Sequence, residues 1–145
     1  RDAVPVIYDE DAEFTIGKAN LLREGKDVAL IAVGDTVRLA IDAAKALHEQ
    51  GIEARVLDMH TIKPLDEASV NACIADIGKI VTIEDHNKIN GLGSAVCECV
   101  AEAGHGIVRR VGIQDQFGES APYERLLAKN GITVENIVAQ AKAIQ

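Results

Sequence analysis

The stretch IVTIEDHNKINGLGSAVC, residues 80–97, decides the fold of this 145-residue chain. It starts with apolar and β-branched residues, passes through a polar turn and resumes at two glycines followed by a helical pattern. This order predicts a buried strand, a turn and a helix. Glu84, Asp85 and His86 follow the expected strand, at the place where ligands of open α/β sheets usually bind. If the chain has catalytic or binding residues of its own, we expect them at the end of this strand.

Elements of the same two kinds recur on both sides of this stretch. A continuous apolar run at 28–33 predicts a strand buried on both faces. Apolar residues within 37–47 then recur at helical spacing, and Gly51 ends that helix. Further strands are expected at 16–22, 54–58, 79–83 and 107–113, and further helices at 66–77, at 91–103, from Pro122 and from Thr133. The alternation predicts a three-layer α/β/α sandwich around a mostly parallel sheet of about five strands.

Local signals mark the starts of several helices. Asp35 and Thr36 are candidate N-caps for the helix at 37–47, and Asp66 is the candidate N-cap of the next one.

Composition excludes several classes of function. The net charge of −8 and the isoelectric point near 4.9 argue against binding to nucleic acids or to anionic membranes. We find no apolar run near the length of a membrane span and no signal peptide. Cys73, Cys97 and Cys99 have neither disulfide nor metal-ligand spacing, which indicates reduced thiols and a cytoplasmic location. Cys73 and Cys97 are expected in the core.

The glycine pair invites comparison with a dinucleotide-binding turn. That fingerprint needs a third glycine three residues after the second, where this chain has Val96. The sequence therefore favours a backbone turn with unusual dihedral angles over a phosphate site at Gly91 and Gly93.

The acidic and histidine side chains do not complete a catalytic set. Neighbours along a strand point to opposite faces, so Glu84 and His86 are expected on one side and Asp85 on the other. A serine or cysteine nucleophile is missing from the expected turn beside them. His48, His60 and His105 are each isolated in the sequence and are expected in solvent or in local capping. We therefore expect this chain to hold no catalytic, cofactor-binding or metal-binding residues of its own.

Three motifs in order carry a resemblance to a known family. Residues 54–66 (ARVLDMHTIKPLD) resemble a segment of the transketolase C-terminal domain, as do residues 81–86 running into 91–94. Residues 115–122 (DQFGESAP), followed by 131–138, are similar to the end of transketolases. The resemblance runs from about residue 16 to residue 144, and residues 1–15 then correspond to a linker from a preceding domain. The family often has two adjacent glycines before the Leu-Gly-Ser of 92–94, and the first of them is Asn90 here. Asparagine tolerates a left-handed backbone better than other non-glycine residues, so the turn is expected to be kept.

The resemblance implies the fold and the function of a larger enzyme. In that family, thiamine diphosphate and a divalent metal such as Mg²⁺ are bound by two other domains, and the enzyme moves a two-carbon ketol unit between sugar phosphates. The third domain packs against the middle domain and contributes to the dimer. This chain would then be inactive alone and would need those domains, on the same chain or on a separate N-terminal subunit, in a homodimer or heterotetramer.

One residue is an exception to the expected lack of site residues. Arg1 and the following residues 2–5 look like the end of the preceding domain, where family members carry an arginine that contacts the sugar phosphate. The resemblance therefore implies that Arg1 binds the substrate phosphate, for which a guanidinium is well shaped.

Two related enzymes share this third domain and remain alternatives. They are deoxyxylulose-phosphate synthase and the β subunit of 2-oxo acid dehydrogenases, in which the domain serves as a partner-docking module. The tail at 117–120 (FGES) favours transketolase over both.

Overall fold

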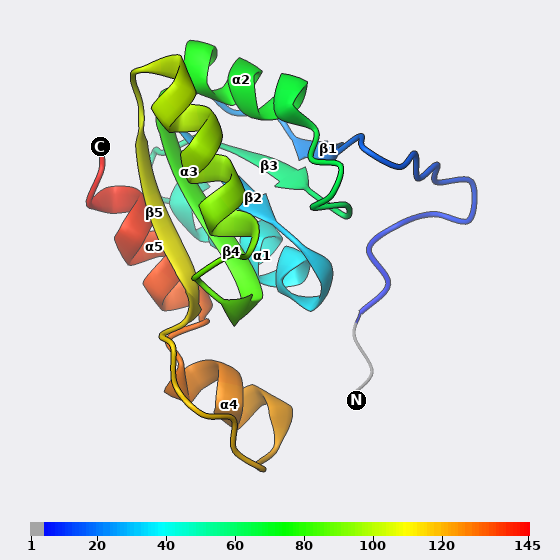
Figure 1. Ribbon diagram of the computed structural model, residues 1–145, viewed down its shortest axis with the longest axis vertical. Coiled ribbons are helices and arrows are strands. Elements are labelled where there is room, and N and C mark those ends of the chain that lie inside the picture. The colour runs from blue at the N-terminus through cyan, green and yellow to red at the C-terminus, as the bar shows by residue number, and fades with distance from the viewer. Residues whose placement is uncertain (1–4) are drawn as a thin grey trace.

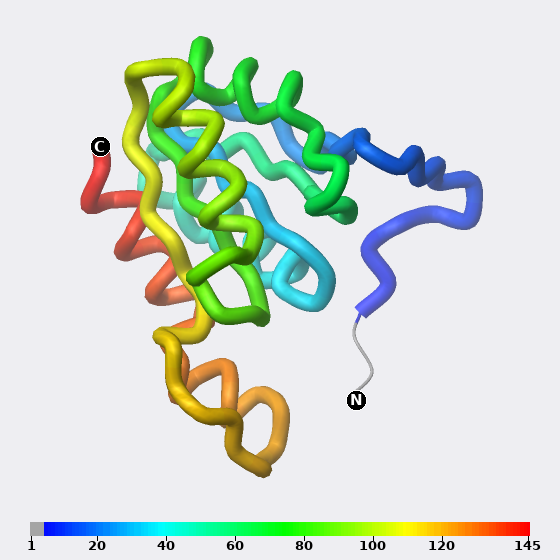
Figure 2. The backbone as a smooth tube through the Cα atoms, viewed as in Figure 1, coloured from blue at the N-terminus to red at the C-terminus, as the bar shows by residue number. Residues whose placement is uncertain are grey.

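Five strands and five α-helices alternate along the chain in the computed structural model, which describes residues 5–145 (Figures 1 and 2). The strands are β1 (Asn20–Arg23), β2 (Val28–Ala32), β3 (Ala54–Asp58), β4 (Lys79–Asn87) and β5 (Ile107–Ile113). The helices are α1 (Val37–His48), preceded by the 3₁₀ turn η1 (Gly34–Thr36), then α2 (Glu67–Asp76), α3 (Leu92–Ala103), α4 (Tyr123–Lys129) and α5 (Val134–Lys142).

The strands form one sheet in the order β1-β3-β2-β4-β5. β3, β2, β4 and β5 are parallel, and only β1, at one edge, runs antiparallel to its neighbour β3. Helices cover both faces of this sheet (Figure 1). The three-layer, mostly parallel architecture expected from the sequence is confirmed.

β2 shows why an unbroken apolar run forms a central strand. All five of its residues are buried. Val28 and Leu30 point into the core beneath α1 and α5, whereas Ala29 and Ile31 point into the core beneath α2 and α3. Successive side chains point to opposite faces, and here both faces are covered. The chain therefore builds two hydrophobic cores of its own and forms a self-contained domain.

Two details in the first third of the chain, the start of β1 and the cap of α1, differ from the sequence prediction. The first strand begins at Asn20 rather than at Ile16, whose side chain is 77% exposed. Neither Asp35 nor Thr36 caps α1 with its side chain. The buried Thr36 hydroxyl instead lies 2.9 Å from the carbonyl oxygens of Val33 and Ile83, to which it can donate. The Ile83 carbonyl, within β4, also accepts from the Val33 N–H at 3.3 Å. The Thr36 side chain is therefore directed to the backbone between β2 and β4 rather than to the start of α1.

Asp66 caps α2 as expected, and it does more. Its carboxylate accepts hydrogen bonds from the Ser69 N–H at 3.2 Å, the Ser69 hydroxyl at 2.7 Å and the Ala19 N–H at 2.9 Å. Burial by itself would raise the pKa of Asp66, but these hydrogen bonds and the nearby Lys18 lower it below its usual range. The cap therefore also ties the chain before β1 to the start of α2.

Replacing Asp66 with asparagine is expected to reduce the acid sensitivity of the domain. The native pKa lies below the unfolded value, so the stability that ionised Asp66 provides is complete above about pH 4 and is lost as the pH falls through the native pKa. Urea unfolding between about pH 2 and pH 4 should show a shallower decline of stability for Asp66→Asn than for the native chain. Glu98→Gln, at an exposed position of α3, is the control and should keep the native decline. An unchanged slope in Asp66→Asn would contradict this role.

Candidate functional site

The end of β4 lies at the point where the sheet reverses its winding. The chain leads from β2 through α1 to β3 on one side of β2, and later enters β4 on the other side. In open α/β sheets the ligand crevice forms at such a switch point. β4 continues to Asn87, so Glu84, Asp85 and His86 belong to the strand itself rather than following it.

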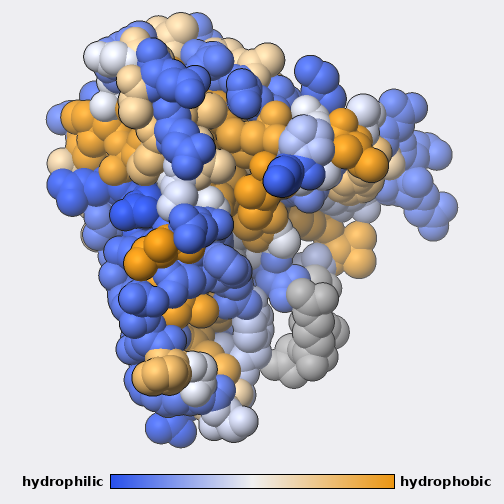
Figure 3. Space-filling view, in the orientation of Figure 1, coloured by the Kyte–Doolittle hydropathy of each residue, from blue (hydrophilic) through white to orange (hydrophobic). Residues whose placement is uncertain are grey.

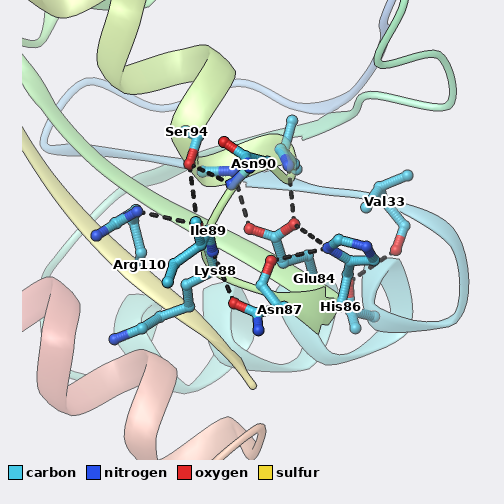
Figure 4. A network of polar contacts seen from close by, with 12 residues as sticks. Val33, Glu84, His86, Asn87, Lys88, Ile89, Asn90, Ser94 and Arg110 are labelled. Atoms are coloured by element: carbon cyan, nitrogen blue, oxygen red, sulfur yellow. Dashed lines mark hydrogen bonds and ion pairs between the residues drawn. The ribbon is translucent and has the colours of Figure 1, made fainter. Parts of the chain in front are cut away.

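Glu84 is fully buried and binds the start of a helix. Its Oε2 accepts a hydrogen bond from the Leu92 N–H at 2.8 Å, and its Oε1 accepts one from the Gly93 N–H at 2.9 Å (Figure 4). These N–H groups open α3 and have no partner within the helix. The carboxylate also lies at the positive end of the helix dipole. Glu84 therefore caps α3 from the neighbouring strand.

This cap occupies the place that a bound phosphate would take. Phosphates bind at helix N-termini through the same N–H groups and the same dipole. At α3 the carboxylate of Glu84 already accepts from Leu92 and Gly93. A second anion there would meet a buried negative charge. The start of α3 is therefore not suited to the diphosphate of a cofactor, which agrees with the sequence preference for a turn.

The two glycines serve close packing rather than unusual dihedral angles. A Cβ on Gly91 would lie 1.9 Å from Oε2 of Glu84, and one on Gly93 would lie 2.7 Å from Cδ of Arg110. Neither glycine has a positive φ, so the expected reason for them was wrong. The left-handed residue of the turn is Asn90, with φ of 62°, as expected.

His86 and Asp85 point to opposite faces, which confirms the expected alternation. His86 lies on the side of Glu84, with Nδ1 2.8 Å from the Asn87 carbonyl oxygen and 3.9 Å from Oε2 of Glu84. Asp85 is exposed on the other side, near Tyr123, and burial together with this carboxylate raises the pKa of the Tyr123 hydroxyl. The three groups therefore do not converge on one reacting atom.

Side chains beyond this strand fix the loop that joins β4 to α3. The Ser94 hydroxyl accepts from the Asn90 N–H and donates to the Lys88 carbonyl, each at 3.0 Å (Figure 4). Arg110 of β5 donates to the same carbonyl at 2.9 Å. No local pattern indicated this role for Arg110, because its distance from Lys88 depends on the pairing of β4 with β5.

A second polar cluster, which sequence reasoning missed, lies at the end of β3. The Tyr8 hydroxyl donates to Oδ2 of Asp58 at 2.6 Å, and burial and this carboxylate raise the pKa of Tyr8 to about 12. Phe14 packs edge-on against both Tyr8 and His60, with ring centroids 4.7 Å and 5.2 Å apart. His60 is thus part of an aromatic cluster and not the solvent-exposed or capping residue that we expected. Among the described residues, Oδ1 of Asp58 and Nε2 of His60 are buried without a hydrogen-bond partner.

A pocket of about 300 Å³ lies where β4, β5 and α4 meet. Its walls are partly apolar and include Ile113, Leu126 and Ile132. Phe117, which is fully exposed to solvent, also lines it. Asp85 and Tyr123 also line it, with no histidine, cysteine or serine among the described residues around it. Its composition suits an apolar side chain better than a reacting substrate.

The cysteines are free thiols, and burial raises the pKa of each of them. Cys73 lies in the core as expected, but Cys97 is only half-buried and Cys99 takes the core position instead. A raised pKa disfavours the thiolate that nucleophilic chemistry needs. Within residues 5–145 we find no group of three or more side chains able to hold a metal ion.

The remaining sequence predictions concern the start of the chain. Arg1 lies outside the described residues. The described part of the segment expected to be a linker, residues 5–15, contains no helix or strand. Among the helices of the described chain, none combines the length and the apolar character needed to cross a bilayer.

Comparison with known proteins shows a family. The family model described as "Transketolase, C-terminal domain" matches residues 17–137. The 6-deoxy-6-sulfo-D-fructose transketolase subunit of Clostridium sp. strain MSTE9 is 46% identical over 138 residues, which are 95% of this chain and 43% of that protein. An apulose-4-phosphate transketolase subunit of Phocaeicola vulgatus is 40% identical over 142 residues, or 97% of this chain and 45% of the relative.

Other matches extend the picture. The 1-deoxy-D-xylulose-5-phosphate synthase 1 of Geobacter sulfurreducens is 41% identical over 133 residues, covering 90% of this chain and 21% of the synthase. A solved structure described as "Split gene transketolase, inactive beta4 tetramer" superimposes with a TM-score of 0.94 at 41% identity, over 99% of this chain and 47% of the other. The chain thus spans less than half the length of these relatives.

Proposed function

Since this chain belongs to the transketolase C-terminal domain family, we propose that it is the third domain of a thiamine-diphosphate enzyme that transfers a two-carbon ketol unit from a ketose phosphate to an aldose phosphate. The cofactor and Mg²⁺ are held by other domains of that enzyme. The domain of this chain supports and completes the assembly, as a homodimer of long chains or a heterotetramer of split ones, in the cytoplasm and in pentose phosphate metabolism.

The match of the family model to residues 17–137 carries this proposal, and the position of Glu84 supports the part of it that places the cofactor in other domains. A cofactor-binding sheet of this type leaves its switch point and the adjoining helix N-terminus free for the ligand. Here the carboxylate of Glu84 occupies the N-terminus of α3, and the Thr36 hydroxyl lies within hydrogen-bond distance of one carbonyl just after β2 and one within β4. The chain therefore uses for its own stability the groups that would hold a cofactor.

Ketol transfer is expected only from the assembled enzyme. The purified 145-residue chain with thiamine diphosphate and Mg²⁺ should form no new sugar phosphate, and activity should appear when the cofactor-binding part is present. Chromatography of the sugar phosphates measures the result. Ketol transfer by the chain alone would overturn the proposal, as would retrieval of an acyltransferase core as its stable partner.

A second candidate is an enzyme of the 1-deoxy-D-xylulose-5-phosphate synthase type. A synthase with this name shares 41% identity with the chain, which lies between the 46% and 40% of the two transketolase subunits. The two reactions are distinguished by product. Formation of 1-deoxy-D-xylulose 5-phosphate by the assembled enzyme, without ketol transfer, would favour the synthase.

Arg1 is proposed to bind the phosphate of the sugar substrate in the assembled enzyme. Support comes from the fixed fork of its guanidinium, which matches phosphate oxygens. Arg1→Gln is expected to raise KM for the phosphorylated substrate by about 10- to 100-fold, the loss of roughly 1.5–3 kcal/mol for a charged hydrogen bond. Steady-state kinetics measures the change. Arg125→Gln, an exposed position on α4, is the matched control, and an equal effect of both would argue against Arg1.

A further inference from the structure

The pocket between β4, β5 and α4 holds polar groups that the domain does not use for its own stability. Its volume of about 300 Å³ lies at the lower end of the range for small-molecule sites. Figure 1 shows α4 projecting beyond the ends of β4 and β5, and Figure 3 shows small hydrophobic patches among hydrophilic side chains over this part of the molecule. Apolar surface combined with a few polar groups is typical of a ligand site.

Most polar side chains around this pocket already have partners within the domain. The pairs are Lys129 with Glu119, Gln116 with Asn130 and Asn87 with Asp115. Two groups differ. The Asp85 carboxylate is exposed and makes no ion pair with another described residue. The Tyr123 hydroxyl is buried, and within residues 5–145 it has no hydrogen-bond partner. These two groups are therefore available to a ligand.

Aromatic rings are concentrated at this pocket. The chain has only two phenylalanines and two tyrosines, and Phe117 and Tyr123 both line the cavity. Phe117 is fully exposed, so the face of its ring is accessible. Aromatic faces attract cations through their quadrupole, and a carboxylate attracts them through its charge. Two aromatic rings beside the unpaired Asp85 carboxylate therefore match an organic ammonium ion.

The charges around the pocket also favour a cation over an anion. Lys129, the one cation among the described lining residues, is already paired with Glu119, which leaves Asp85 as the unbalanced charge. Burial, Asp85 and the more distant Asp35 raise the pKa of the Tyr123 hydroxyl. The hydroxyl is therefore neutral at physiological pH, and its oxygen can accept a hydrogen bond from an ammonium group. A sugar phosphate or another anion would be repelled by Asp85.

We propose that this pocket binds a small organic ammonium ion. The apolar part of the ion lies against Ile113, Leu126 and Ile132, and its ammonium group lies between Asp85 and Tyr123. No histidine, cysteine or serine is found among the described residues of the lining, so the ion is a ligand and not a reactant. This site does not depend on the proposed function, because its groups all belong to this domain.

Three probes of nearly the same shape test the charge preference on the purified 145-residue chain. 2-Phenylethylammonium should bind with a Kd of about 1 mM, as expected for a ligand of this size. The uncharged 2-phenylethanol should bind at least about tenfold more weakly, and 3-phenylpropionate should not bind. Amide chemical shifts in NMR spectra measure the binding. Saturable shifts should be confined to the end of β4 and to residues 113–132.

Matched substitutions assign the binding to named groups. Asp85→Asn should weaken the binding of 2-phenylethylammonium at least about tenfold and leave that of 2-phenylethanol unchanged. Asp11→Asn removes the same charge at an exposed position before β1 and should have no effect. Phe117→Ala should weaken the binding about two- to fivefold, whereas Phe14→Ala, at another exposed aromatic side chain, should not.

Other outcomes would overturn the proposal. They are the absence of saturable shifts up to about 20 mM probe, equal binding of the ammonium and the alcohol, and equal effects of Asp85→Asn and Asp11→Asn. Equilibrium dialysis of 2-phenylethylammonium against the intact enzyme should give a similar Kd. Binding to the isolated chain but not to the intact enzyme would show that the assembly closes the pocket, and the ligand site would be rejected. None of these measurements depends on ketol transfer, so this site and the proposed function can fail separately.

Discussion

Replacing Glu84 with alanine is expected to lower the free energy of unfolding by about 3–5 kcal/mol, a large part of the stability of a domain of this size. The substitution removes both acceptors of the Leu92 and Gly93 N–H groups, which remain buried. Each hydrogen bond to a charged group contributes roughly 1.5–3 kcal/mol, and water cannot easily replace it at a fully buried position. Urea unfolding followed by circular dichroism measures the loss.

Two variants at the same end of β4 sharpen this test. Glu84→Gln keeps one acceptor oxygen and the shape of the side chain, so it should lose less stability than Glu84→Ala. Asp85→Ala removes the adjacent but exposed carboxylate and should change stability by less than about 1 kcal/mol. A Glu84→Ala variant as stable as Asp85→Ala would show that the cap has little importance.

Gly91→Ala is expected to destabilise the domain by a similar amount, about 3–5 kcal/mol, because it disrupts the same contact. The new Cβ would lie 1.9 Å from Oε2 of Glu84 and 2.9 Å from the Asn87 carbonyl oxygen. The carboxylate would have to leave its place, and the hydrogen bonds to α3 would be lost with it. Gly118→Ala is the matched control, because nothing lies within 4 Å of its Cβ and its φ is not positive.

The two substitutions should also be coupled. Once Glu84 is alanine, the space that the Cβ of Gly91→Ala would enter is vacant. The double variant should therefore be only slightly less stable than Glu84→Ala alone, giving a large interaction energy in a double-mutant cycle. Additive losses would contradict the explanation that Gly91 is glycine to admit the Glu84 carboxylate.

These expectations change the meaning of the polar residues at the end of β4. Acids and a histidine at a switch point usually suggest catalysis, and a glycine pair at a helix start usually suggests a phosphate. Here the buried acid binds the helix start itself, and the glycines make room for it. The polar groups that face α3 at the end of β4 therefore stabilise the domain itself.

Local patterns predicted the parts of the fold that depend on near neighbours in the sequence. The apolar run of β2 indicated burial on both faces, and the cap at Asp66 was identified from residue type and position. The left-handed Asn90 was expected from the resemblance, because it stands in place of a glycine of the family. The opposite orientation of Glu84 and Asp85 followed from the two-residue repeat of a strand. The prediction that Thr36 caps α1 was wrong, because its hydroxyl lies within hydrogen-bond distance of the Ile83 carbonyl, 47 residues away. No local rule includes such a contact.

The sequence by itself thus determined the layers, the mostly parallel sheet and the family, because periodicity and local motifs report which side of each element is buried. Only the tertiary structure decided what the polar groups do. The pairing of Glu84 with α3 depends on the path of the β4–α3 loop, and that of Tyr8 with Asp58 spans 50 residues. Such contacts exist only after strands and helices have packed, since packing sets the distance between groups that the chain order leaves far apart.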